Sequence, residues 1–149
     1  MRAVVQRVKK ANVCVDQQEI ANIPQGFVVL LGISADDSED EAKYLAKKIS
    51  NLRIFNDEQG KMTYSLQQVD GQILSISQFT LIANVKKGNR PNFAKAMQPD
   101  RANELYQKFN QELEQYLPNK IQTGIFGADM QVELINDGPV TIIYDTKEG

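Results

Sequence analysis

Two hydroxyls and a carboxamide lie close together in Ser77-Gln78-Phe79-Thr80, at the end of an apolar segment that we expect to be a strand. A buried hydroxyl or amide without a hydrogen bond costs about 1–3 kcal/mol, so a fold keeps such a cluster only where partners satisfy it. A bound substrate is one such partner, and the backbone at the strand end is another. The four residues alone leave both interpretations open.

A second unusual segment is Asn136-Asp137-Gly138-Pro139-Val140-Thr141, which separates two alternating segments near the C-terminus. Asp-Gly is typical of a tight hairpin between such strands. Proline after glycine is unexpected there, because its nitrogen carries no hydrogen for the returning strand. Only about 5–6% of X–Pro bonds are cis, and a cis bond would turn neighbouring carbonyls outward as rigid acceptors. From these residues alone we predict a plain turn.

The chain contains no histidine and a single cysteine, Cys14. This composition excludes Ser-His-Asp and Cys-His catalysis and argues against a zinc site, so we expect neither a metal nor a cofactor. A general base contributes about 10²–10⁴-fold to a rate, so hydrolysis would need a labile bond or a base supplied by the substrate. Activated esters meet this condition, whereas ordinary amides do not.

The 149 residues, of which 42% are hydrophobic and 24% charged, predict one folded domain over residues 1–149. The longest apolar run, residues 27–33, is too short for the ~20 residues of a membrane span, so no membrane partner is expected. The charged, alternating N-terminus is unlike a signal peptide, and the lone cysteine favours a reducing compartment, so we expect a cytoplasmic protein.

The net charge of −2 gives no general attraction to nucleic acid, so any contact with a polyanion must be local. The one suitable cluster is Lys86-Lys87-Gly88-Asn89-Arg90-Pro91, where glycine and proline predict a loop. Such a loop is either a phosphate contact or simply a solvated basic segment.

Periodicity predicts a mainly β chain with two helices. The first helix begins near Asp37 and Ser38 and ends near Ser50, and the second runs from Pro99 until Pro118 stops it. Short links between the strands favour largely antiparallel pairing, and hence an α+β fold. We expect strands at residues 3–8, 13–15, 27–33, 53–55, 73–77, 130–135 and 140–144, followed by a polar tail over 145–149.

Four segments together resemble the D-aminoacyl-tRNA deacylases, formerly called D-tyrosyl-tRNA deacylases. They are Met1-Arg2-Ala3-Val4-Val5-Gln6-Arg7-Val8, Arg53-Ile54-Phe55, Ser77-Gln78-Phe79-Thr80-Leu81 and Asn136-Asp137-Gly138-Pro139-Val140-Thr141. The resemblance implies a cytoplasmic homodimer with a β-barrel-like sheet, helices packed on it, and an active site at the dimer interface. It also implies hydrolysis of the ester that joins a D-amino acid to the terminal ribose of tRNA. Glycyl-tRNA mischarged on tRNA-Ala is implied as a second substrate.

The same resemblance assigns roles to single residues. It implies that Gly138 and Pro139 form a cis peptide that enters the active site from the partner subunit and acts as a chirality gate, supported by Arg7. Rigid main chain facing the α-carbon leaves room for hydrogen but none for an L side chain, so the site rejects L-aminoacyl groups without selecting any D side chain. The residues implied to grip the ester and the 3′-terminal adenosine are Ser77, Gln78, Phe79 and Thr80, with Phe126 and Met130 walling the adenosine pocket.

Two questions stay open at this point. Thr80 is either a nucleophile or a residue that positions the substrate; without histidine, the substrate's own ribose 2′-hydroxyl is the economical base. The basic loop is either solvated or contacts tRNA phosphates, and the residues that would make those contacts are Lys86, Lys87 and Arg90. The alternatives to a deacylase are a non-catalytic RNA-binding module and a D-amino-acid ester hydrolase with a threonine nucleophile.

Overall fold

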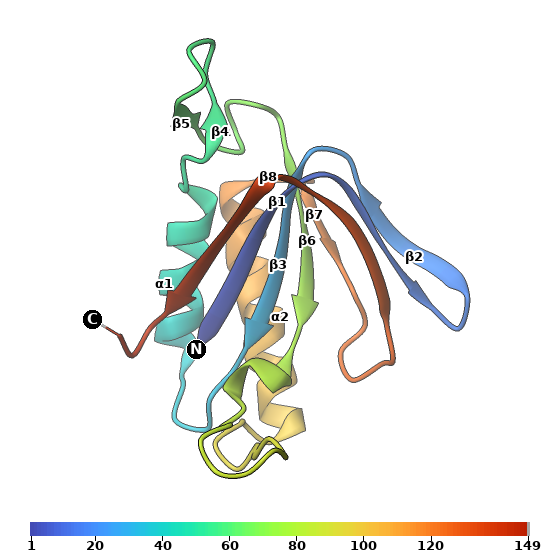
Figure 1. Cartoon of the computed structure of the whole chain (residues 1–149), viewed down its shortest axis with the longest axis vertical. Coiled ribbons are helices and arrows are strands. Elements are labelled where there is room, and N and C mark those ends of the chain that lie inside the picture. Colours follow the sequence, from blue (N-terminus) through green and yellow to red (C-terminus); the bar gives the residue numbers. More distant parts are fainter. Residues whose placement is uncertain (149) are drawn as a thin grey trace.

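A curved six-stranded sheet forms the body of the molecule, which the computed structural model describes over residues 1–148 (Figure 1). Gly149, the last residue of the expected domain and tail, lies outside the described residues. The strand order is β2-β1-β3-β6-β7, with β8 also paired to β1, and β4 and β5 form a separate ribbon. The strand bounds are β1 Arg2–Val15, β2 Gln18–Ile23, β3 Gly26–Gly32, β4 Phe55–Asn56, β5 Met62–Tyr64, β6 Gln72–Ser77, β7 Ile121–Thr123 and β8 Gln131–Asp145.

Strand β1 organises the sheet because it pairs antiparallel with three other strands. Its first half pairs with β3 from Arg2↔Gly32 to Val8↔Gly26, and its second half pairs with β2. Strand β8 runs beside β1 over nearly its whole length. This long, shared strand bends the sheet into the expected barrel-like body.

Two strand pairs are parallel, β3 with β6 and β6 with β7. Parallel neighbours need a long crossover, and each crossover here carries a helix. Helix α1, Glu39–Ser50, lies between β3 and β6, and α2, Pro99–Tyr116, lies between β6 and β7. The predicted α+β fold with two main helices is confirmed; the antiparallel pairs are the three made by β1 and the separate β4–β5 ribbon.

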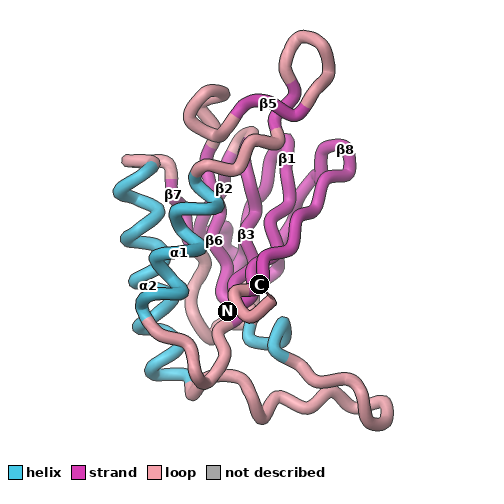
Figure 2. The backbone as a smooth tube through the Cα atoms, turned by 90° about the vertical axis from the view of Figure 1, so that its left-hand side faces the viewer, coloured by secondary structure: helices cyan, strands magenta, loops and turns pink. Residues whose placement is uncertain are grey.

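Both helices pack on the same side of the sheet (Figure 2). Ser38 caps α1 in a capping box with Glu41, and Pro99 begins α2, as the sequence predicts. Ala42, Leu45, Leu105 and other apolar residues at helical spacing are buried against Phe27 and its neighbours in the sheet. This core covers the face of the sheet on which the two helices lie. The site described below lies at one end of the sheet. In the part of the chain that the structure describes, no helix is long and apolar enough to cross a membrane.

The α-amino group of Met1 is buried between the sheet and α1. It forms an ion pair with Asp37 Oδ2 at 2.8 Å and donates a hydrogen bond to Thr146 Oγ1 at 2.9 Å. Asp37 also accepts a 2.7 Å hydrogen bond from the backbone N–H of Ser34. The carboxylate therefore joins the start of β1, the end of β3 and the start of α1.

The predicted hairpin at Asp137-Gly138 is wrong. Residues 131–145 form one strand, β8, because the residues on both sides of Gly138 pair with the same strand β1, Asn136 opposite Val8 and Thr141 opposite Gln6. Residues 137–140 bulge out opposite Arg7, and the Gly138-Pro139 bond is cis, so the plain turn predicted from the residues is also wrong. Likewise, the two strands predicted at 3–8 and 13–15 are one strand, and β2, β5 and β7 were not predicted.

Candidate active site

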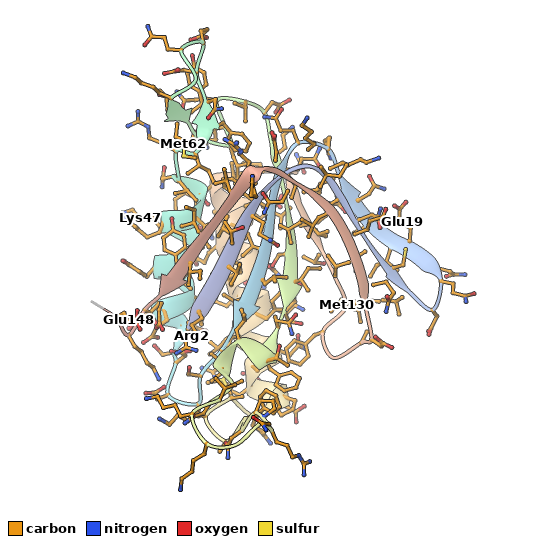
Figure 3. The ribbon with its side chains drawn as sticks, in the orientation of Figure 1. Arg2, Glu19, Lys47, Met62, Met130 and Glu148 are labelled. Atoms are coloured by element: carbon orange, nitrogen blue, oxygen red, sulfur yellow. The ribbon has the colours of Figure 1, made fainter. Side chains whose placement is uncertain are left out.

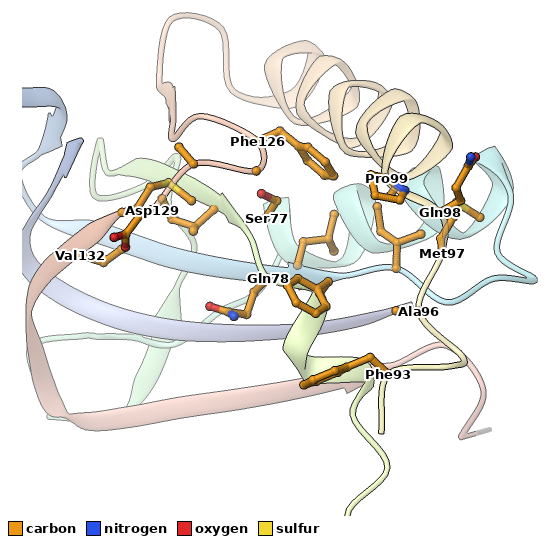
Figure 4. A pocket seen from close by; sticks show the side chains of 18 residues that line it. Ser77, Gln78, Phe93, Ala96, Met97, Gln98, Pro99, Phe126, Asp129 and Val132 are labelled. Atoms are coloured by element: carbon orange, nitrogen blue, oxygen red, sulfur yellow. The ribbon is translucent and has the colours of Figure 1, made fainter. Parts of the chain in front are cut away.

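A cleft of about 620 Å³ opens beside the C-terminal end of β6 (Figure 4). Its walls come from the end of β6, the 3-10 helix η1 (Phe79–Ile82), the loop that leads into α2, and the segment between β7 and β8. The side chains that line it are mostly apolar, with the polar groups of Ser77, Gln78, Gln98 and Asp129 among them. An apolar cleft with a few polar groups is the usual form of a small-molecule site.

Ser77 and Gln78 reach the cleft because the sheet ends there. Ser77 pairs with Leu31 of β3, and the Gln78 N–H donates to the Leu31 carbonyl at 2.7 Å. After Gln78 the chain turns into η1, which leaves the Phe79 ring 59% exposed at the edge of the cleft. Three residues of the predicted polar cluster, Ser77, Gln78 and Phe79, therefore line the cleft.

Thr80 lies next to the cleft, outside the set of residues that line it. Its Oγ1 accepts a hydrogen bond from Nε2 of Gln78. A carboxamide is not a base in either orientation, so this contact orients the Thr80 hydroxyl without removing its proton. The hydrogen bond thus suits a positioning role better than a nucleophilic one.

Phe126 and Met130 line the wall of the cleft that the segment between β7 and β8 forms. The wall is fixed where Gly124 N–H donates to the Ser75 carbonyl at 3.1 Å, a carbonyl that also accepts from the buried Tyr106 hydroxyl at 2.6 Å. A Cβ on Gly124 would lie 2.6 Å from the Met130 sulfur, so any larger residue there would require the Met130 side chain to move. Burial raises the pKa of Tyr106, which keeps its hydroxyl protonated as the donor.

The bulge formed by residues 137–140 is held from both sides. Arg7, only 6% exposed, donates from Nε to the Asp137 carbonyl at 2.9 Å and from Nη1 to the Ile54 carbonyl at 2.7 Å. Asn136 Oδ1 accepts from the Val140 N–H at 2.7 Å on the other side. Arg7 is therefore a buried support of the bulge and not a surface cation.

Gly138 and Pro139 themselves are exposed, and they lie far from the cleft of their own chain. The bulge lies opposite Arg7, which pairs with Phe27, whereas Ser77 pairs with Leu31, four residues further along β3. Four residues correspond to about 13 Å along the strand, and β8 and β6 are also three strand spacings apart, each ~4.8 Å. In Figure 3, the labelled Met130, which lines the cleft, lies well away from the labelled Met62 of β5.

The basic cluster lies in an exposed loop that projects beside η1, at the lower end of the molecule in Figure 1. Asn84 and Asn92 exchange backbone hydrogen bonds of 2.7 and 2.9 Å at its stem. Each of their side chains also accepts from a backbone N–H two residues later, Lys86 and Ala94. The prediction of a loop is confirmed, with Lys86, Lys87 and Arg90 all exposed.

The sequence analysis did not anticipate the residues that complete the cleft from the loop before α2. Phe93, Met97 and Gln98 line it, and Phe93 contacts Phe79 with ring centroids 5.1 Å apart. Nothing in their local pattern signals a site, because only the fold brings this loop beside β6. Ile54 and Asn56, which hold Arg7 in place, were missed for the same reason.

Comparison with known proteins identifies the family. A family model described as D-Tyr-tRNA(Tyr) deacylase matches residues 4–145. A solved structure described as "c-Myc DNA Unwinding Element Binding Protein" is 45% identical, with a TM-score of 0.93 over 98% of this chain and 99% of that one. A "probable eukaryotic D-amino acid tRNA deacylase" shares the fold, with a TM-score of 0.84 and 16% identity over 96% of this chain and 97% of that one. The chain therefore belongs to the D-Tyr-tRNA(Tyr) deacylase family, and the expected hydrolysis of the D-aminoacyl-tRNA ester is confirmed.

Proposed function

We propose that the protein acts as a cytoplasmic homodimer in which each cleft hydrolyses D-aminoacyl-tRNA and is completed by the bulge of the second subunit. The observation that carries this proposal is the position of Gly138. The bulge is exposed, rigidly held, and three strands away from the cleft of its own chain. A second copy of the chain can present it to the cleft, whereas its own subunit cannot.

In this arrangement the bulge acts as the chirality gate. The main chain of Gly138 and Pro139 faces the α-carbon of the bound aminoacyl group, and Arg7 keeps the Asp137 carbonyl in place. A D-aminoacyl group directs hydrogen toward the gate, whereas an L-aminoacyl group directs its side chain there and is excluded. Glycine has no side chain to exclude, so glycyl-tRNA mischarged on tRNA-Ala is also a substrate.

The remaining residues bind the rest of the tRNA end. Phe126 and Met130 form the wall against which the terminal adenosine lies, and the ester lies beside Ser77 and Gln78. The basic loop that carries Lys86, Lys87 and Arg90 contacts phosphates of the acceptor end. These contacts give a net acidic protein a local attraction to tRNA.

Hydrolysis in this cleft proceeds without an imidazole. Water attacks the ester carbonyl carbon, and the developing oxyanion is stabilised by backbone N–H groups at Phe79 and Thr80 together with the Gln78 amide. The ribose 2′-hydroxyl accepts the proton from water and passes its own to the departing 3′-oxygen. The products are the free D-amino acid and intact tRNA. One oxyanion donor is worth about 10²–10³-fold, which is substantial for so labile an ester.

Chirality is tested with D-tyrosyl-, L-tyrosyl- and glycyl-tRNA. We expect rapid hydrolysis of the D-tyrosyl and glycyl esters and background hydrolysis of the L-tyrosyl ester, measured as single-turnover rates. Equal rates for the two tyrosyl enantiomers would overturn the proposed gate.

Substrate assistance has a separate test, which uses D-aminoacyl-tRNA with a 2′-deoxy terminal adenosine. We expect a rate at least about 10²-fold lower, because the 2′-hydroxyl is the proposed proton relay. An undiminished rate would show that the base belongs to the protein.

A further inference from the structure

The side-chain rings of an aromatic pair at the edge of the cleft have no role in the hydrolysis proposed above. Phe79 and Phe93 meet edge to face, with centroids 5.1 Å apart and planes at 69°. The residue Phe79 is 59% exposed, so it remains accessible beside this contact. Figure 4 shows Phe93 on the side of Ser77 and Gln78 opposite Phe126. The pair therefore lies across the cleft from the wall proposed for the adenosine.

The basic loop arises directly from this pair. Along the chain, Phe79 precedes the loop and Phe93 follows it. The backbone hydrogen bonds between Asn84 and Asn92 close the stem of the loop. Val85, 70% exposed, adds an apolar side chain to the loop itself. Flat apolar rings and a group of exposed cations are thus combined on one short stretch of chain.

This combination matches the chemistry of single-stranded nucleic acid. Proteins bind such strands by stacking bases on aromatic rings while a basic surface follows the phosphates. The 3′ end of tRNA is single-stranded, and its terminal nucleotide carries the ester. A nucleotide that leaves the cleft on the side opposite Phe126 would meet Phe79 and Phe93.

We infer that Phe93 and Phe79 form a stacking platform for the base immediately 5′ of the terminal adenosine, while the loop cations neutralise the adjoining phosphates. The inference rests on the proposed function, because it requires the ester beside Ser77 and the adenosine against Phe126. It adds a second nucleotide subsite and makes an oligonucleotide end a better substrate than an aminoacylated nucleoside. Stacking does not depend on a particular base, so the platform holds any nucleotide at that place.

The test compares three D-tyrosyl esters: that of adenosine, that of the trinucleotide CCA, and that of CCA lacking the middle base. For the unchanged protein we expect kcat/KM to fall by about 5- to 150-fold when the middle base is removed, the usual range for one stacked base. Phe93→Ala should lower kcat/KM on CCA by a similar factor and make the protein indifferent to the missing base. Its effect on the adenosine ester should be clearly smaller than its effect on the CCA ester. Phe93→Tyr, which keeps a ring face, should restore the sensitivity.

Tyr44→Ala is the matched control, because Tyr44 is an aromatic residue 54% exposed on α1. It should change none of these ratios. The inference fails if Phe93→Ala lowers activity equally on the adenosine and CCA esters, which would place the adenine itself on the ring. It also fails if Phe93→Ala acts only by changing the oligomeric state, measured by sedimentation. If no D-tyrosyl ester is hydrolysed faster than its L enantiomer, the proposed function fails instead.

Discussion

Arg7 connects three parts of the chain that are distant in sequence, and this connection holds the bulge in place. Its guanidinium reaches the Asp137 carbonyl, the Ile54 carbonyl and Asn56 Oδ1 from one buried position. Lysine could not reproduce these contacts, since it carries a point charge in place of a planar fork. The sequence indicated the importance of Arg7 only through family resemblance, because its partners are 47 and 130 residues away.

For Gly138→Ala we expect a loss of stability together with a loss of D-aminoacyl-tRNA hydrolysis. The residue has a φ of +138°, and a Cβ there would lie 2.8 Å from Val140 Cγ2 and 3.0 Å from Arg7 Nη2. Strain of this kind costs about 1–3 kcal/mol and would displace the bulge. Urea unfolding and single-turnover rates measure the two effects.

The control is Gly60→Ala in the turn between β4 and β5. Gly60 also has positive φ, +78°, but nothing lies within 4 Å of its added Cβ. This variant should lose some stability and keep the full rate. If Gly138→Ala also kept the full rate, the bulge would have no part in the site.

For Thr80→Ala we expect a rate reduced by less than about 10²-fold, because the hydroxyl forms one hydrogen bond and has no base beside it. Rapid-quench experiments with labelled D-tyrosyl-tRNA should detect no acyl-enzyme. A loss above about 10⁴-fold, together with a trapped acyl group on the unchanged protein, would make Thr80 the nucleophile.

At the scale of elements, Asp37 shows how the start of β1 is tied to α1. Its carboxylate is buried and paired with the α-amino group of Met1. Breaking a buried ion pair leaves an uncompensated charge and costs about 3–5 kcal/mol. We expect Asp37→Asn to lose this amount, measured by urea unfolding. Asp36→Asn, at an exposed neighbour, should lose far less, and equal losses would contradict the assigned role.

The basic loop makes a prediction about salt. Replacing Lys86, Lys87 and Arg90 by glutamine should weaken tRNA binding and reduce the slope of log K against log salt by about 2, since each single-strand phosphate contact contributes ~0.7. Filter binding at several salt concentrations measures this slope. The charge-matched control replaces the exposed residues Lys43, Lys47 and Lys48 of α1. An unchanged slope in the loop variant would show that the loop is solvated and makes no phosphate contacts.

The helices and the principal strands could be predicted from sequence, because each carries its own periodicity and caps. The errors occur where a distant strand decides the outcome. Lys9 and Lys10 are both exposed and interrupt the alternation of β1, yet β1 continues because β8 pairs with it across a bulge. Asp137-Gly138 suggested a chain reversal, but pairing to β1 on both sides keeps β8 in line. The parallel pairs β3–β6 and β6–β7 could not be predicted, because no local sequence pattern indicates which strands a long crossover brings together.

The residues of the candidate site likewise fall into those that local sequence indicates and those that only the fold brings together. Ser77, Gln78 and Phe79 could be found from sequence because polar groups at the end of an apolar strand are unusual. Phe93 and Met97 could not, since they reach the cleft only through the path of the loop before α2. Gly138 was identified as a special position, but its distance from the cleft required the register of four strands.

At the scale of the whole molecule, the cleft lies at one end of the sheet, and the supported bulge lies toward the other. In the proposed two-fold dimer, the bulge of each subunit would complete the cleft of the other, which would make two identical sites. Activity is therefore expected to depend on protein concentration, falling as dimers dissociate on dilution.

Heterodimers of two damaged chains test this arrangement most directly. One chain carries Gln78→Ala, which damages the cleft, and the other carries Gly138→Ala, which damages the bulge; different tags allow purification of the mixed dimer. If the bulge serves the opposite cleft, one site of the two is intact, and the D-tyrosyl-tRNA deacylation rate should be about half that of the unchanged dimer. A rate no higher than the mean of the two separate variants would contradict a site shared between subunits.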